Sequence, residues 1–574
     1  MVSSADWTSS RITAEWLTSR TFTLRVDPGA EILSSNLVFH RNGLIIGHQR
    51  SSETYWALDG GTLSLIDHNG RPTCRMAPER CGGAAPRLSG FYLDPGACYE
   101  QTATAHVLEA NESDYHSRLQ SFDLFDTLVA RRCYYATSVF RKLESRTGIK
   151  DFASRRHSLE MSIFGRRPYG LSDIYELLIA ESVISEKQAA MLQLMELQEE
   201  WDNIFPIAEI VSIVNPDDII ISDMYLPYSF LKRILEEKCG LDNALYLSNY
   251  GKHKKQVWPT ILEKYRLREH LGDNPHADVE SPAAFGIPGR LVTISRWSAA
   301  EEILNDAGLT TYAQAARETR LQAHHRDPQT RNALQAQIGV NIPLMILGAL
   351  WIRICAEDFG ADRVLAASRD CNLWHRLLAS NHFARAGIPS SLYVQMSRKL
   401  CYSNSDAYEA YLRSRLGDRT LLVDLVGTGR SLRRIVQRLV LQDTLLPCIL
   451  VAESAEDCAQ APAPACLIFR DFDPYRVVLE VLNASREGRA VAATVQDDRI
   501  VIETRENEFG PVARGIIGEM QSAALAFLAT LDRFDAPKPP PLPNLRAAAE
   551  AIVDLIPEHS LKLEPLLSEH RKNI

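Results

Sequence analysis

An apolar stretch that ends in an acidic residue constrains the fold of this chain more than any other feature. Residues 121–129 read Ser-Phe-Asp-Leu-Phe-Asp-Thr-Leu-Val, so a strand-like approach ends at Asp123, and a long helical region begins after Asp126 and Thr127. Open α/β sheets bind their ligands at the carboxyl ends of buried strands. The stretch therefore predicts a parallel sheet that carries a carboxylate at its ligand-binding edge.

Length and composition indicate a soluble multidomain protein. A chain of 574 residues is too long for one core, so roughly three or four domains are expected. The net charge of -9 argues against a nucleic-acid binder. The eleven cysteines include no Cys-x-x-Cys pair, which argues against zinc ribbons and disulfides and favours the cytoplasm. The N-terminus lacks a signal-peptide pattern, and Asn341 and Pro343 interrupt the most apolar run, which predicts a buried helix and no transmembrane segment.

The first part of the chain, residues 1–112, is predicted to be a small all-β module of the sandwich or barrel type. Its short apolar runs are separated by glycine-containing turns at residues 41–43, 59–61 and 68–70. Its aromatic residues could stack on sugar rings, but we expect them to fill the core of a small β domain. These aromatic residues are Phe39, Tyr55, Trp56 and Tyr92.

Two α/β domains are predicted after this module, so the expected fold class is multidomain α/β. In residues 113–312, strands that end near Asp123 and Ser222 flank a helical insertion at about residues 135–210. In residues 313–536, a helical segment precedes a second series of alternating strands and helices. Residues 537–574 are predicted to be a proline-rich linker and a helical tail.

Four motifs in residues 115–310 resemble those of the haloacid-dehalogenase (HAD) superfamily, whose phosphatases use an aspartate nucleophile. The order is Asp-x-x-x-Thr at Asp123, a serine that ends a later strand at Ser222, a lysine cluster at residues 251–255, and Gly-Asp-Asn followed by Asp278. The runs Ser-Asp-Met-Tyr-Leu-Pro and His-Leu-Gly-Asp-Asn are similar to a subgroup associated with polysaccharide assembly. The resemblance implies a Rossmann-like domain with a helical cap.

The resemblance also implies a site for phosphoryl transfer. Asp123 would attack phosphorus and form an aspartyl phosphate, while Ser222 and a lysine would hold the phosphate oxygens. Mg²⁺ would be the cofactor, because hard cations prefer oxygen ligands. The implied metal ligands are Asp123, the backbone oxygen of Phe125, Asp273 and Asp278.

The chain departs from the HAD pattern at two places. The family usually has a second acid two residues after the nucleophile, where this chain has Phe125 and then Asp126. Either Asp126 substitutes as acid and base, or the leaving group needs little acid help, or the domain is not a phosphatase. The spacing also does not choose among Lys252, Lys254 and Lys255, and we predict Lys254.

A second anion site is predicted at residues 421–432, where a buried strand ends at Asp424 before a Gly-Thr-Gly loop and a helix. The loop resembles the phosphoribosyl-pyrophosphate (PRPP) loop of type I phosphoribosyltransferases, although Val423 occupies the position of a second acid. The resemblance covers about residues 335–480. The implied PRPP-binding residues are Ser368, Arg369, Asp370, Arg398, Lys399, Asp424, Gly427, Thr428, Gly429 and Ser431.

Together the two resemblances imply a bifunctional enzyme of bacterial capsule or O-antigen assembly. It would transfer 5-phosphoribosyl from PRPP to a glycan acceptor and then remove the 5-phosphate, leaving ribofuranose. One alternative is a HAD phosphatase for a small phosphoester with a non-catalytic C-terminal domain. The other is a regulatory nucleotide- or phosphate-binding protein. Peripheral association with a polysaccharide-assembly complex at the membrane is left open.

Overall fold

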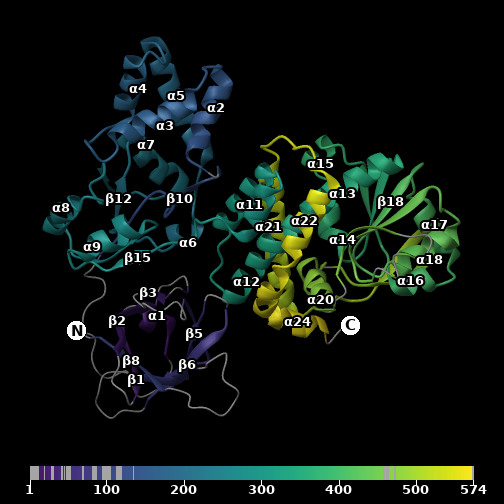
Figure 1. The fold of residues 1–574 in the computed structure, drawn as a ribbon. Coiled ribbons are helices and arrows are strands. Elements are labelled where there is room, and N and C mark those ends of the chain that lie inside the picture. Colours follow the sequence, from purple (N-terminus) through teal and green to yellow (C-terminus); the bar gives the residue numbers. More distant parts are fainter. Residues whose placement is uncertain are drawn as a thin grey trace. The chain divides into compact units, whose positions relative to one another are not determined.

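A computed structural model describes residues 12–111 apart from 19, 28–31, 40–42, 44, 47–53, 68–69, 80–86 and 93–104. It also describes residues 119–571 apart from 134, 455, 457–458, 460–463, 471–472, 486 and 508. The chain forms two compact units, Met1–Arg296 and Trp297–Ile574. The fold is multidomain α/β, with an antiparallel half-barrel near the N-terminus and two parallel sheets later in the chain (Figure 1).

The half-barrel is one antiparallel sheet of eight strands in the order β3-β2-β1-β8-β7-β6-β5-β4. Two backbone bonds link the regions of its end strands β3 and β4: the Ile45 N–H donates to the Thr54 carbonyl, and the Trp56 N–H donates to the Gly43 carbonyl. Phe39, Tyr55 and Trp56 are buried, as expected for core residues, whereas residues 41–42, 68–69 and the Tyr92 side chain lie outside the described part. The strands are β1 (Thr21–Asp27), β2 (Ile32–Phe39), β3 (Ile45–Ile46), β4 (Tyr55–Asp59), β5 (Thr62–Ile66), β6 (Pro72–Pro78), β7 (Arg87–Tyr92) and β8 (Ala105–Ala110).

The first parallel sheet has the strand order β13-β12-β9-β14-β15. The chain moves from the central strand β9 to β12 and β13 on one side, and later returns to β14 and β15 on the other. The carboxyl end of β9 therefore lies at a topological switch point, where such sheets bind ligands. The strands are β9 (Leu119–Phe122), β12 (Ile219–Asp223), β13 (Ala244–Ser248), β14 (Leu267–Gly272) and β15 (Gly289–Leu291).

A helical insertion leaves this sheet through a stem of two short strands. β10 (Val129–Arg131) pairs antiparallel with β11 (Ile204–Pro206), and four helices lie between them in sequence. These helices enclose a hydrophobic cluster of their own, which includes Phe152, Tyr175 and Leu192. The helices are α2 (Thr137–Thr147), α3 (Phe152–Ile163), α4 (Leu171–Ala180) and α5 (Glu186–Asn203).

The second unit contains a parallel sheet in the order β17-β16-β18-β19-β20. Among the described helices, only Pro328–Phe359 has the length and composition to span a membrane, and most of its apolar window is buried inside the protein. This burial agrees with the predicted core helix. The strands are β16 (Arg363–Ala367), β17 (Ser390–Val394), β18 (Thr420–Gly427), β19 (Leu445–Ala452) and β20 (Ala465–Phe469), followed by the hairpin β21 (Ala490–Gln496) and β22 (Arg499–Thr504).

Both ends of the second unit differ from the predicted boundaries. The unit begins at Trp297 rather than at residue 313, because α10 (Ala299–Asp306) packs against α11 (Thr310–Gln322) and α22 (Leu542–Val553). The predicted tail is not separate either. Helix α22 packs against α13 (Ile342–Phe359) and buries Leu545, Ile552 and Val553 in the main core, since these residues lie on one helical face.

Candidate functional site

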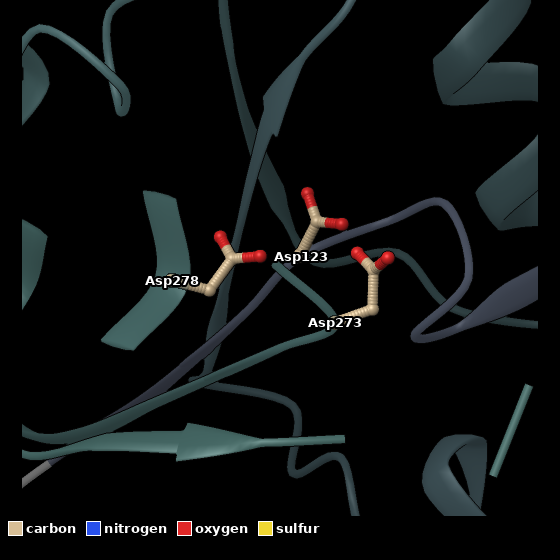
Figure 2. A group of neighbouring side chains, drawn as sticks. All are labelled: Asp123, Asp273 and Asp278. Carbon is tan, nitrogen blue, oxygen red and sulfur yellow. The ribbon is translucent and has the colours of Figure 1, made fainter. Parts of the chain in front are cut away.

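Three aspartates converge at the carboxyl edge of the first parallel sheet (Figure 2). Asp123 follows β9 and Asp273 follows β14, while Asp278 lies on the π-helical turn η3 (Pro275–Glu280). One carboxylate oxygen from each residue lies within 4.8 Å of the others. Asp123 and Asp278 are buried, and Asp273 is half-buried. The structure thus brings together the three acidic residues that the sequence analysis selected, in a group that could hold a metal ion.

Local backbone geometry fixes two of these aspartates. The Asp123 N–H donates to the Leu271 carbonyl at 2.8 Å, which joins the end of β9 to β14. The Asn274 N–H donates to Asp278 Oδ2 at 3.0 Å. Gly272 makes room for Asp278, since a Cβ atom at position 272 would lie 2.2 Å from Asp278 Cγ.

The lysine of the site is Lys252, so the prediction of Lys254 is corrected. Lys252 is buried, and its Nζ lies 2.5 Å from Asp123 Oδ1 and 2.7 Å from Asp278 Oδ1. Lys254 is exposed, and its amine lies 5.4 Å from the centre of the Tyr250 ring. The Asp223 carboxylate accepts a hydrogen bond from the Lys252 N–H and so orients the backbone of this turn. In this orientation, the Lys252 side chain extends toward Asp123.

The site contains more carboxyl groups than basic groups. The pKa of Asp123 lies well above its ordinary value. Burial, Asp278 and Asp273 raise it by more than Lys252 lowers it. Burial, together with Asp126 and Asp278, raises the pKa of Asp273 to about 7. Burial would also raise the pKa of Asp278, but Lys252 and His270 lower it below its ordinary value. Three carboxylates face one ammonium group, so a bound cation would relieve their repulsion.

The remaining predicted residues of this site lie in the same loops. Ser222 is buried at the end of β12, next to β9 in the sheet. The turn after Asp123 is closed by an Asp126 N–H bond to the Val129 carbonyl at 2.6 Å, with Asp126 in the left-handed region at φ 55°. Phe125, whose carbonyl was a predicted metal ligand, lies in this turn with its ring 4.4 Å from the Arg131 guanidinium carbon. Thr127 is fully buried, and its hydroxyl has no hydrogen-bond partner among the described residues.

Two residues that the sequence analysis did not select support the site. His270 is fully buried, with Nε2 3.1 Å from Asp278 Oδ1 and Nδ1 2.8 Å from Ser121 Oγ. Burial lowers its pKa. Asp223, directly after Ser222, binds the backbone of the Lys252 turn. Both residues lie within the runs compared with the polysaccharide-assembly subgroup, Ser-Asp-Met-Tyr-Leu-Pro and His-Leu-Gly-Asp-Asn, and this was the available signal.

The helical insertion contacts both loops that approach Asp123. The Leu171 N–H donates to the Tyr225 carbonyl at 3.0 Å, in the loop that follows Ser222. The Tyr169 N–H donates to Asn249 Oδ1 at 3.2 Å, in the turn that carries Lys252. The insertion therefore lies against the Asp123 site, where it can cover a bound molecule.

In the second unit, the structure brings the predicted residues Asp370 and Asp424 together. Asp370 follows β16, whereas Asp424 lies within the neighbouring strand β18, which runs on to Gly427 rather than ending at Asp424 as predicted. Burial raises the pKa of Asp370 well above its ordinary value, with further increases from Glu480 and Asp424. Burial also raises the pKa of Asp424 to about 7, although a bond from the Leu425 N–H at 2.9 Å opposes this. The two carboxyl groups therefore form a second acidic group within this unit.

The other predicted PRPP-binding residues differ in their surroundings. Gly427 and Gly429 have φ values of 149° and 72° and precede helix α18 (Arg430–Leu439). Thr428 and Ser431 are half-buried at this helix start, and Arg369 lies near Asp370. The Ser368 hydroxyl is bound to the Met396 backbone at 2.8 Å, so it joins two loops. Arg398 and Lys399 are exposed in the first turn of α16 (Arg398–Tyr402).

Comparisons with known proteins give no family for this chain. No model of a protein family matches the sequence, and no curated protein matches it.

Proposed function

We propose that this protein is a Mg²⁺-dependent phosphatase whose nucleophile is Asp123. The observation that carries the proposal is the contact of the buried Asp123 carboxylate with the Lys252 amine, next to Asp273 and Asp278. The donor set consists of carboxylate oxygens, which suit a hard cation such as Mg²⁺. Phosphoryl transfer depends mostly on positioning and on neutralising charge, and these residues supply both.

Each residue has a defined role in the proposed reaction. An oxygen of Asp123 forms a bond to phosphorus while the bond from phosphorus to the leaving oxygen breaks. Lys252 and Ser222 bind the phosphoryl oxygens, and Asp126 is the carboxyl group proposed to protonate the leaving oxygen. Asp123, Asp273 and Asp278 would hold Mg²⁺, which would add positive charge at the phosphoryl group. Water then hydrolyses the aspartyl phosphate and restores Asp123.

Hydrolysis of p-nitrophenyl phosphate with Mg²⁺ tests this proposal. We expect Asp123→Asn to abolish the reaction and Lys252→Met to lower kcat by about 100-fold or more, because a buried cation at the phosphate is lost. Lys254→Met is the matched control, and its kcat should stay within about twofold of the wild type, because its side chain is exposed. Equal losses for the two lysine variants would contradict the assigned site.

A second proposed activity is phosphoribosyl transfer from PRPP in the second unit. It is supported by the proximity of Asp370, which follows β16, to Asp424 in the neighbouring strand β18, and by the glycine-containing start of α18 after β18. Carboxylates suit ribose hydroxyls or a bound cation, and a helix start suits a phosphate. The combined proposal is ribofuranosyl transfer to a glycan acceptor, in which the Asp123 site removes the 5-phosphate. A phosphatase with a non-catalytic second unit and a regulatory phosphate-binding protein are the alternatives.

Thermal unfolding with Mg²⁺, with and without PRPP, tests the second site. We expect PRPP to raise the melting temperature of the wild type by several degrees, because a ligand that binds only the folded state stabilises it. Asp424→Ala should remove this shift, whereas Asp443→Ala, an exposed acid after α18, should keep it. If PRPP shifted neither the wild type nor the control, the phosphatase alternative with a non-catalytic second unit would be favoured.

A further inference from the structure

The turn that carries Lys252 contains two residues in an unfavourable backbone conformation. Residues 249–256 connect β13 to α8 (Val257–Lys264) and close on themselves through backbone bonds, such as that from the Gln256 N–H to the Gly251 carbonyl at 2.8 Å. Tyr250 and Lys255 adopt φ values of 69° and 65°. The left-handed region is unfavourable for residues other than glycine, so contacts from outside must hold this turn.

Asp223 supplies these contacts from the neighbouring strand. Its carboxylate oxygens lie 3.1 and 3.0 Å from the Lys252 N–H nitrogen, and it also accepts a bond from the His253 N–H at 3.3 Å. The Ser248 hydroxyl donates to it as well. Among the described residues, no cationic side chain forms an ion pair with Asp223. The carboxylate instead accepts hydrogen bonds from backbone N–H groups and a hydroxyl group.

The carbonyl side of Lys252 is fixed by a different element. The Ser281 hydroxyl donates to the Lys252 carbonyl, and the Trp258 indole N–H donates to Ser281 Oγ at 2.8 Å. Ser281 and Trp258 are fully buried. With its N–H and its carbonyl both held, the Lys252 backbone has one orientation, and its side chain extends toward Asp123 and Asp278.

We propose that Asp223 is a positioning residue that acts through Lys252. The end of β12 would then position both groups that bind the phosphoryl oxygens. It carries Ser222 itself, and it positions Lys252 through the Asp223 carboxylate. Displacement of a catalytic group by about 1 Å can reduce a rate by about 100-fold, so fixing this turn matters for the reaction. The inference rests on the proposed phosphatase function. A simple anchor of the fold would instead affect stability without depending on Lys252.

A double-mutant cycle separates these two roles. The variants are Asp223→Asn, Lys252→Met and the double variant, assayed for kcat with p-nitrophenyl phosphate and for the affinity of inorganic phosphate in Mg²⁺. We expect Asp223→Asn to lower both values by about 10-fold or more in the wild-type background and by less than about twofold when Lys252 is already replaced. Equal losses in both backgrounds would overturn the proposal.

Further variants keep the test interpretable. Ser248→Ala removes one donor to Asp223 and should show the same dependence on Lys252 at smaller size if Asp223→Asn fails to fold. Asp242→Asn, an exposed acid whose side chain is 93% accessible, should leave kcat unchanged. A wild type that binds phosphate without hydrolysing the ester would contradict the proposed function, while the phosphate-affinity cycle would still test Asp223. A wild type that binds no phosphate would overturn both.

Discussion

At the scale of single residues, the Asp123 site combines buried carboxylates with too few cations to balance them. Lys252 bridges Asp123 and Asp278, whereas no cationic side chain among the described residues forms an ion pair with Asp273. Its pKa is raised to about 7 by burial and by neighbouring acids. Because the pKa of Asp273 is higher in the folded protein than in the unfolded chain, proton binding to Asp273 stabilises the folded state. This contribution is fully present below the ordinary pKa of 3.8 and is lost as the pH rises through about 7.

The affinity for Mg²⁺ should therefore depend on pH. Below pH 7, Asp273 must release its proton before it can bind the cation, so the affinity should fall by about tenfold per pH unit. Calorimetric titration at pH 8, 7 and 6 measures the effect, and buffers of different ionisation enthalpy report the released proton. Asp273→Asn should weaken binding and reduce the pH dependence, while Asp123, whose pKa is also raised by burial, should account for the remainder. The same Mg²⁺ affinity at pH 6 and pH 8 would contradict the assignment of Asp273 as the titrating ligand.

The sequence was informative for residues at strand ends and less so for residues in turns. Asp123, Asp273 and Asp278 could be predicted because they follow buried strands or a Gly-Asp motif, and the structure groups them. The choice of Lys252 could not be predicted, because it depends on a turn that Asp223 binds from another strand. His270 was missed because a buried histidine on a strand is usually a core residue.

At the scale of elements, one loop of the helical insertion is fitted to the Lys252 turn. Gly165 has a φ of 70°, and a Cβ atom there would lie 3.1 Å from the Tyr250 ring. The Phe164 ring packs edge-on against Tyr250 at 4.8 Å. The sequence predicted the helical insertion but not its stem, because pairing of β10 with β11 joins very short segments that lie far apart in the chain.

Replacing Gly165 should affect activity as well as stability. Gly165→Ala and Gly148→Ala should each cost roughly 1–2 kcal/mol, because both residues have left-handed backbones. Only Gly165→Ala brings a Cβ atom against Tyr250, since position 148 has open space. We therefore expect a lower kcat/KM for Gly165→Ala alone, together with similar urea unfolding of both variants. Adding Tyr250→Ala to Gly165→Ala should restore part of the activity, and a loss of equal size in Gly148→Ala would refute this contact.

At the scale of the whole molecule, the chain consists of two units with separate cores. The cluster around α13 lies within Trp297–Ile574, and the clusters of the half-barrel and of the helical insertion lie within Met1–Arg296. Patterns in the sequence predicted the alternating strands and helices of both parallel sheets. They did not predict that residues 537–574 belong to the second core, because a polyproline run suggested a linker.

The two units should fold when they are expressed as separate polypeptides. Residues 1–296 and 297–574 should each unfold cooperatively, because each buries its own apolar surface. Mg²⁺ with phosphate should raise the melting temperature of the first polypeptide only, and Mg²⁺ with PRPP that of the second only. Polypeptides that stay unfolded until they are mixed would show that the units depend on each other.

The stem formed by β10 and β11 has a consequence for how this protein can change. Because Arg131 pairs with Ile204, the chain leaves and re-enters the sheet domain at neighbouring points. Residues 132–203 can therefore be lengthened, shortened or exchanged without altering the order of the parallel strands that carry Asp123, Ser222 and Asp273. The helical insertion and the sheet domain that carries the acidic group are thus free to evolve as separate modules.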